Sequence, residues 1–89
     1  MTQTTWKPHP HHGELSSKER DHLPENAFAF PTQRKEPMTD AGHVRNALSR
    51  FNQVHDVSDA ERDAAFQNIK AAAKHFGVEI TETHWKDLA

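Results

Sequence analysis

The 89-residue sequence contains no cysteine, and this absence excludes several kinds of site and cross-link. Without thiols there is no disulfide framework, no thiol nucleophile and no thiolate metal site, so the fold must rest on packing. The sequence also lacks an apolar run near the roughly 20 residues that span a bilayer, and its polar start lacks the apolar stretch of a signal peptide. We therefore expect a soluble, cytoplasmic protein with no membrane partner.

Great length, strong charge and catalytic motifs are missing as well. A chain this short buries only about 60% of its unfolded surface, which leaves little room for an enclosed active site. There is no elbow-type serine motif, no pair of histidines at metal spacing on a helix and no glycine-rich nucleotide loop. The formal net charge is −2, whereas a dedicated nucleic-acid binder usually carries a basic excess. We predict that the protein is not an enzyme and uses no cofactor.

The first 13 residues hold two prolines, three histidines and almost no apolar side chains. This composition predicts a disordered tail over residues 1–13, in which Trp6 is a lone exposed aromatic. Imidazoles commonly bind zinc, copper and nickel, so His9, His11 and His12 invite a metal hypothesis. A flexible segment with three imidazoles lacks the fixed fourth ligand of a structural site. We predict a solvated tail without a metal site, with weak adventitious binding as the alternative.

Apolar spacing predicts two amphipathic helices, over about residues 40–54 and 59–76. The second should begin at a capping box, in which Ser58 and Glu61 satisfy backbone donors, and should end at Gly77 in a left-handed cap. Only residues 55–57 connect the two helices, so we expect an antiparallel helical hairpin. The predicted core consists of Phe51, Phe66, Ile69 and Phe76, surrounded by Val44, Leu48 and Trp85.

The flanking segments predict shorter elements. Ser16 and Glu19 form a second capping box that opens a short N-terminal helix, and Trp85 falls in a short C-terminal helix. Phe28 and Phe30 precede Pro31, which requires extended backbone, so they should form an extended aromatic arm docked on the helices. The predicted fold class is therefore all-α, with a single small helical domain over residues 14–89.

Six segments of the sequence have a distinctive wording: LPENAFAFP at 23–31, RKEP at 34–37, HVRNALSRF at 43–51, VSDAERD at 57–63, IKAAA at 69–73 and FGV at 76–78. Together they resemble an uncharacterised small domain family of bacterial and phage proteins. The resemblance covers about residues 13–88 and leaves the histidine-rich tail outside. It implies no assigned activity, although similar segments accompany some phage head-maturation proteins.

Five basic residues, Arg34, Lys35, His43, Arg45 and Arg50, are the candidates for contacts with an anion or a partner protein. At 100° per residue, Arg45 flanks the apolar stripe of the first helix on one side, and His43 and Arg50 flank it on the other. Side chains at such boundaries commonly lay their stems over the core and pair their charges with acids. We favour that interpretation, in which Arg45 and Arg50 do not converge.

One further pairing can be predicted for the basic residues. Under the packing interpretation, Arg34 or Lys35 should pair with acids of the second helix such as Asp59 or Glu61. Asp40 and His43 lie one turn apart and could be drawn as an acid/base pair, but an N-cap beside a boundary histidine explains both.

Three functions remain open after these exclusions. The leading hypothesis is a protein-interaction module that binds another protein, because a helical hairpin with a docked arm presents surfaces and no cavity. The alternative is a nucleic-acid or phosphate-binding accessory domain that acts through Arg34, Lys35, Arg45 and Arg50, since arginine forks suit phosphate geometry. An enzyme is the third and least favoured. The sequence predicts no oligomeric state.

Overall fold

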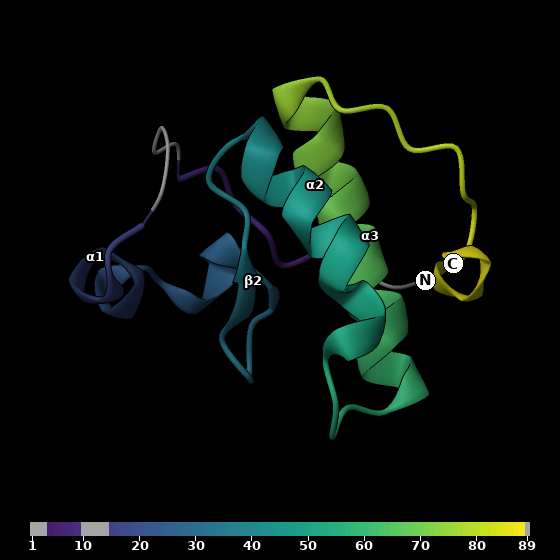
Figure 1. Cartoon of the computed structure of the whole chain (residues 1–89), viewed down its shortest axis with the longest axis horizontal. Helices are drawn as coiled ribbons and strands as arrows, with labels where there is room; N and C mark the ends of the chain where they lie inside the picture. Colours follow the sequence, from purple (N-terminus) through teal and green to yellow (C-terminus); the bar gives the residue numbers. More distant parts are fainter. Residues whose placement is uncertain (1–3, 10–14, 89) are drawn as a thin grey trace.

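The computed structural model describes residues 4–9 and 15–88, and two helices packed side by side in opposite directions form its centre (Figure 1). A small β-hairpin and a short helix lie on one side of this pair, and the C-terminal segment lies on the other. The helices and strands, in chain order, are α1 (Ser17–His22), η1 (Glu25–Ala27), β1 (Phe28–Phe30), β2 (Lys35–Pro37), α2 (Ala41–Arg50), η2 (Phe51–Gln53), α3 (Asp59–Phe76) and η3 (Trp85–Asp87).

The β-hairpin shows that the predicted all-α fold class is wrong, because the domain is mixed α/β. Strand β1 pairs antiparallel with β2, in a register that sets Phe28 opposite Pro37 and Phe30 opposite Lys35. The extended arm before Pro31 was predicted correctly as extended backbone, but its pairing partner was not predicted. Three residues of β2 are too few to show an alternating pattern, and the strand ends in a proline.

The central helical hairpin agrees with the sequence-based expectation, and its ends follow from local chemistry. In α2 the Asp40 carboxylate caps the first turn by accepting the backbone N–H of His43. In α3 the predicted capping box between Ser58 and Glu61 is present in both directions. Gly77 ends α3 with a φ of 73°, a left-handed conformation that glycine adopts without steric cost.

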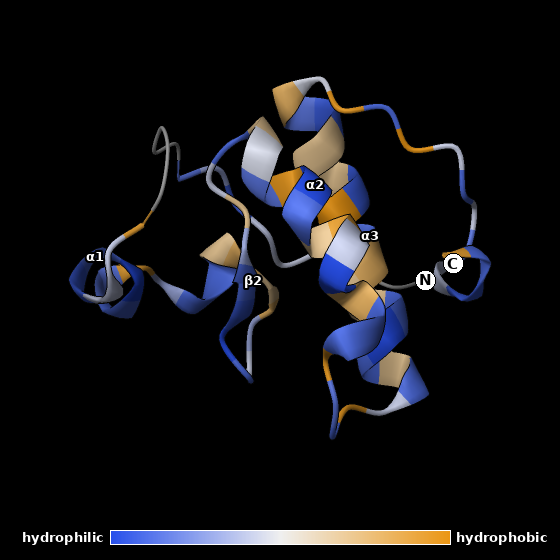
Figure 2. Ribbon diagram, viewed as in Figure 1, coloured by the Kyte–Doolittle hydropathy of each residue, from blue (hydrophilic) through white to orange (hydrophobic). Residues whose placement is uncertain are grey.

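The core lies between the β-hairpin and the two central helices, and α2 and α3 both contribute apolar residues to it. Figure 2 shows that apolar and polar stretches alternate along both helices. Phe51 is fully buried, with its ring centre 5.4 Å from that of Phe30 and 6.1 Å from that of Phe66. The predicted core residues Val44, Phe51, Phe66 and Ile69 are buried, whereas Leu48, Phe76 and Trp85 are partly buried around them. Phe28 and Phe30, which were expected to dock on the helices, are buried, whereas the prediction missed the buried residues Trp6 and Met38.

The prediction of an exposed Trp6 in a disordered tail is wrong, because Trp6 packs against the core, although Thr4, Thr5, Lys7 and Pro8 beside it are exposed. Only 6% of Trp6 is exposed, and its indole N–H donates a hydrogen bond to the Met38 carbonyl over 3.2 Å. The backbone N–H of Lys7 donates to the carbonyl of Asn26 over 2.9 Å. A large aromatic with a polar N–H gains from burial when that N–H finds an acceptor, as it does here. Residues 1–3 and 10–13 of the predicted tail, including His11 and His12, lie outside the described residues.

After Gly77 the chain runs back along α3 as an extended segment that ends in η3 (Figure 1). Its apolar residues Val78, Ile80 and Leu88 are partly buried against the core. The Trp85 indole N–H donates to the Asp63 carboxylate over 2.6 Å and fixes η3 on α3. Within the described residues, the helices are too short or too polar to cross a membrane.

Candidate functional site

Two neighbouring hollows form a polar groove between the β-hairpin and α2, and both are lined by Glu36 and Arg50. The hollow towards α1 has a volume of about 240 Å³, and the hollow towards the α2–α3 connection has a volume of about 350 Å³. We call them the α1-side hollow and the connection-side hollow. The first is also lined by Leu15, Arg20, Pro37, His43 and Asn46. The second is also lined by Gln33, Lys35, Gln53, Val54, His55 and Asp56.

Glu36 lies at the centre of the groove, in an unusual backbone conformation. Its φ is 59°, in the left-handed region, which costs a residue with a side chain about 1 to 3 kcal/mol unless surrounding contacts offset the cost. The carboxyl group is half-buried, and the charges of Arg50, Arg20, Lys35 and His43 act on it. These four cationic or titratable side chains come from α1, β2 and α2.

The ionisation of Glu36 is shifted by this environment. Burial raises the pKa of the Glu36 carboxyl above its usual range of about 4.5, because the charged form loses hydration. The positive charge of Arg50 opposes the shift most strongly, followed by Arg20, Lys35 and His43, but burial outweighs them together. Glu36 is therefore a half-buried carboxyl among four basic side chains, one of which, His43, also contacts Asp40.

Asp40 and His43 form a fixed pair at the start of α2. The Asp40 Oδ1 atom accepts the His43 backbone N–H over 2.8 Å and lies 2.8 Å from the His43 Nδ1. The Thr39 hydroxyl lies 3.4 Å from the same ring nitrogen. Asp40 is thus the N-cap that the sequence predicts, and it orients the imidazole that lines the α1-side hollow.

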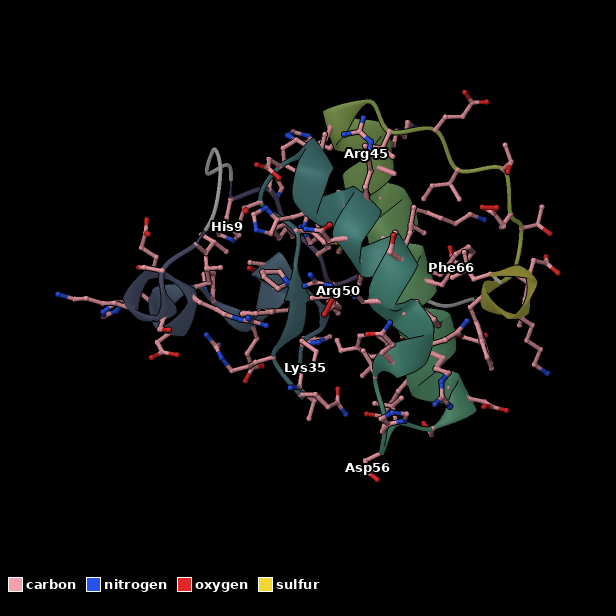
Figure 3. The ribbon with its side chains drawn as sticks, in the orientation of Figure 1. His9, Lys35, Arg45, Arg50, Asp56 and Phe66 are labelled. Carbon is pink, nitrogen blue, oxygen red and sulfur yellow. The ribbon has the colours of Figure 1, made fainter. Side chains whose placement is uncertain are left out.

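Three of the five candidate site residues, Lys35, His43 and Arg50, line the groove. Arg45 lines neither hollow, and Figure 3 places it towards the opposite end of the helical pair from Lys35. Its place agrees with the helical angles, which put Arg45 and Arg50 on opposite flanks of α2.

Arg34 is occupied elsewhere, at the C-terminal end of α1. One guanidinium nitrogen donates to the carbonyls of Arg20 at 3.0 Å, Asp21 at 3.3 Å and Leu23 at 2.8 Å. The guanidinium also lies over the ring of Phe28, 4.7 Å from its centre. A cation here satisfies carbonyls that the helix end leaves without intrahelical donors.

The predicted pairing of Arg34 or Lys35 with acids of α3 is wrong in the structure. Glu61 accepts a hydrogen bond from the side chain of Gln33, and the Asp59 Oδ1 atom lies 3.5 Å from the Arg62 Nη1. The Ser58 backbone N–H and the Gln33 side chain hold the pKa of Glu61 below its usual value of about 4.5. Neutral donors from the turn and the cap therefore take the place of the expected ion pair at Glu61, and Asp59 pairs within its own helix with Arg62.

Glu36, Arg20 and Asn46 line the groove, but sequence reasoning missed them. Helical spacing places Asn46 on the flank of α2 that carries His43 and Arg50, but no spacing brings Glu36 and Arg20 there, because their approach depends on the β-hairpin. One signal could have found Glu36. Lys35 and Glu36 are charged and precede a proline, and this combination is typical of an edge strand.

Of the three histidines considered for a metal site, His9, His11 and His12, His9 lies within the described residues. The described residues contain no group of three or more histidine, aspartate or glutamate side chains that could hold a metal ion. The His9 Nε2 lies 2.7 Å from the side-chain oxygen of Asn26, so this imidazole is held by a neutral partner.

Comparison with known proteins places the chain within one family. Residues 10–83 match a protein-family model that is described as a family of unknown function. This confirms the resemblance to an uncharacterised domain family. Neither the curated proteins nor the solved structures contain a match.

Proposed function

The chain belongs to a family of unknown function (DUF6582), and we propose that the domain is a non-enzymatic protein-interaction module. Because the family membership assigns no activity, the proposal rests on the site itself. The observation that carries the proposal is the groove around Glu36 and Arg50, on which charged side chains from α1, β2 and α2 converge. Such an open polar surface offers specific contacts to a partner without enclosing a small substrate.

Nucleic-acid or phosphate binding receives less support from the groove. Of the residues on which that hypothesis depends, Lys35 and Arg50 line the groove, whereas Arg34 caps α1 and Arg45 lies apart. Glu36 and Asp56 add negative charge at the groove, which opposes a phosphate backbone. We retain protein binding as the proposed function and treat nucleic-acid binding as an outcome of the test.

The setting of the module is part of the same proposal. We propose that it works in the cytoplasm, within a bacterial or phage-derived protein. The cysteine-free composition supports the first statement, and the sequence resemblance supports the second.

Affinity capture with matched charge reversals tests the proposal. Arg50→Glu reverses a charge in the groove, and Arg45→Glu makes the same change on the same helix outside it. Proteins captured from the native cell by the full-length wild type and by Arg45→Glu, but lost with Arg50→Glu, are the expected result. Identical capture by all three proteins, or recovery of nucleic acid in a salt-sensitive complex, would contradict it.

A further inference from the structure

The two hollows of the groove differ in charge balance. The α1-side hollow has Arg20 and Arg50, with Glu36 as the carboxylate among its lining residues, and the imidazole of His43 there contacts the Asp40 carboxylate over 2.8 Å. The connection-side hollow has Lys35 and Arg50 together with Glu36 and Asp56, so its formal charges balance. The α1-side hollow is therefore the part of the groove with a surplus of positive charge.

The basic side chains of the α1-side hollow suit a small anion such as a single carboxylate. Two arginines from different elements provide planar donor groups, which recognise carboxylates better than a lysine does. Asn46, on α2 between His43 and Arg50, adds a side-chain amide that can donate. A volume of about 240 Å³ suits one or two side chains of an extended peptide.

We infer that the groove binds an acidic segment of a partner protein, one carboxylate of which enters the α1-side hollow and competes with Glu36 for the Arg20 and Arg50 charges. The inference deepens the proposed function and rests on it. Glu36 is then an internal competitor, which keeps the arginines partly neutralised when no partner is bound.

An acidic peptide fits the groove better than a nucleic-acid backbone, because its negative charges lie farther apart. Double-stranded DNA carries one charge per about 1.7 Å of its axis and needs a long array of cations. Here the cations gather on one hollow, and the adjoining hollow has Glu36 and Asp56 among its lining residues. Side chains on one face of an extended peptide recur about every 6.5 Å, so an acid in the first hollow can be followed by a neutral or basic residue in the second.

The competition makes binding dependent on pH. The groups that face Glu36 are Arg20 from α1, Lys35 from β2, and His43 and Arg50 from α2. As the pH falls towards the raised pKa of Glu36, this carboxyl loses its charge before the peptide's glutamates do, and binding should strengthen. His43 also faces Glu36 and contacts Asp40, so its replacement by glutamine is included as a second variant.

A labelled peptide titration tests the inference with the full chain. The probe is a nine-residue serine peptide with blocked ends and a glutamate at every fourth position, so that serine follows glutamate on the same face, and its control has glutamine in place of glutamate. We expect Arg50→Gln to weaken binding of the acidic probe by about tenfold or more, since a charge-assisted bond is lost. Glu36→Gln should tighten it by about threefold to fivefold, and Arg45→Gln should leave it unchanged.

The opposite signs of the two groove variants guard against a folding artefact, because a misfolded protein does not bind more tightly. On lowering the pH from 7.5 to 5.5, Glu36→Gln should lose part of the increase in affinity seen in the wild type, whereas His43→Gln, which leaves Glu36 in place, should keep that part. Equal affinity for the glutamate and glutamine probes, or weaker binding by Glu36→Gln, would overturn the inference. Tighter binding of a ten-nucleotide single-stranded DNA than of the acidic probe would also overturn it.

The two proposals fail separately. If the acidic probe does not bind at millimolar concentration but capture of cellular proteins still depends on Arg50, the acidic-segment inference is wrong and the interaction module stands. If capture does not depend on Arg50, the proposed function itself is wrong for this groove.

Discussion

The side-chain oxygen of Asn68 accepts a hydrogen bond from the backbone N–H of Trp6 over 3.1 Å, although the two residues are 62 positions apart. The same oxygen accepts the N–H of Thr5 over 2.8 Å. The Asn68 amide nitrogen donates to the Thr5 hydroxyl and to the Ala29 carbonyl, each over 3.1 Å. One buried amide thus joins the N-terminal segment, β1 and α3.

Asn68→Ala should release the N-terminal segment and lower the free energy of unfolding by about 2 to 4 kcal/mol, because buried backbone donors lose their acceptor. Denaturant titration measures the loss, and hydrogen exchange should show faster exchange at the amides of Thr5 and Trp6. Gln67→Ala, on the same helix but less buried, is the control and should change stability by less than about 0.5 kcal/mol. Equal effects of the two substitutions would show that the amide is not a structural link.

Tryptophan fluorescence tests the burial of Trp6 directly. With Trp85→Phe as background, Trp6 is the remaining tryptophan of the sequence and should emit at the blue-shifted wavelengths of an apolar site. Trp6→Ala should cost about 3 to 5 kcal/mol, as expected for removal of a buried aromatic. Emission from Trp6 at the wavelength of a solvated indole in the folded protein would restore the disordered tail as the correct description.

The parts of the fold that the sequence predicts correctly are those that depend on contacts between residues close together in the sequence. The helical hairpin was predicted because its signals are local: the Ser58 cap, the Gly77 stop and the apolar spacing between them. Trp6 was assigned to a disordered segment because its acceptors, Met38 and Asn68, lie far along the chain. No property of residues 1–13 alone indicates them.

The candidate site was predicted in part for the same reason. His43 and Arg50 share a flank of α2, so helical angles place them together, and the groove contains both. Arg34 was grouped with them by its charge, but the turn between the two strands directs it to α1 and Phe28. Charge type predicts which residues can bind an anion, whereas only the tertiary fold decides which of them remain available.

Ser58→Ala should lower the free energy of unfolding by about 1 kcal/mol, because the Ser58 hydroxyl accepts the Glu61 backbone N–H at the start of α3. Ser49→Ala is the matched control, since Ser49 lies on the exposed side of α2 and bonds only back to the Arg45 carbonyl. The control should change stability by less than about 0.5 kcal/mol. Thermal or urea unfolding compares the two, and a larger loss in the control would contradict the assigned cap.

Glu36→Gln should change how stability depends on pH. Because the pKa of Glu36 is raised in the folded state, its protonated form favours folding: the contribution is present in full below the unfolded value of about 4.5 and is lost as pH rises through the folded pKa. At pH 7.5 the glutamine variant should therefore be as stable as the wild type or more stable. Urea unfolding from pH 7.5 to 4.5 should show the wild type gaining on the variant as pH falls, and a difference independent of pH would contradict the raised pKa.

Arg34→Lys should separate a structural role of this arginine from a ligand-binding one. Lysine keeps the charge but cannot reproduce the guanidinium contacts with the carbonyls of α1 and the ring of Phe28, so we expect a loss of about 1 to 2 kcal/mol and faster amide exchange in α1. The backbone at Arg34 has a φ of 52°, which lysine and arginine adopt at a similar cost. Lysine also keeps the charge and a long side chain, so the variant changes mainly the guanidinium contacts. Arg45→Lys, an exposed arginine of α2, is the control and should be neutral to within about 0.5 kcal/mol. Affinity for the acidic peptide should be unchanged in Arg45→Lys, and any loss in Arg34→Lys should accompany the loosening of α1, which carries Arg20. A stable Arg34→Lys variant with weakened peptide binding would show instead that Arg34 belongs to the binding surface and that α1 is held in place by other contacts.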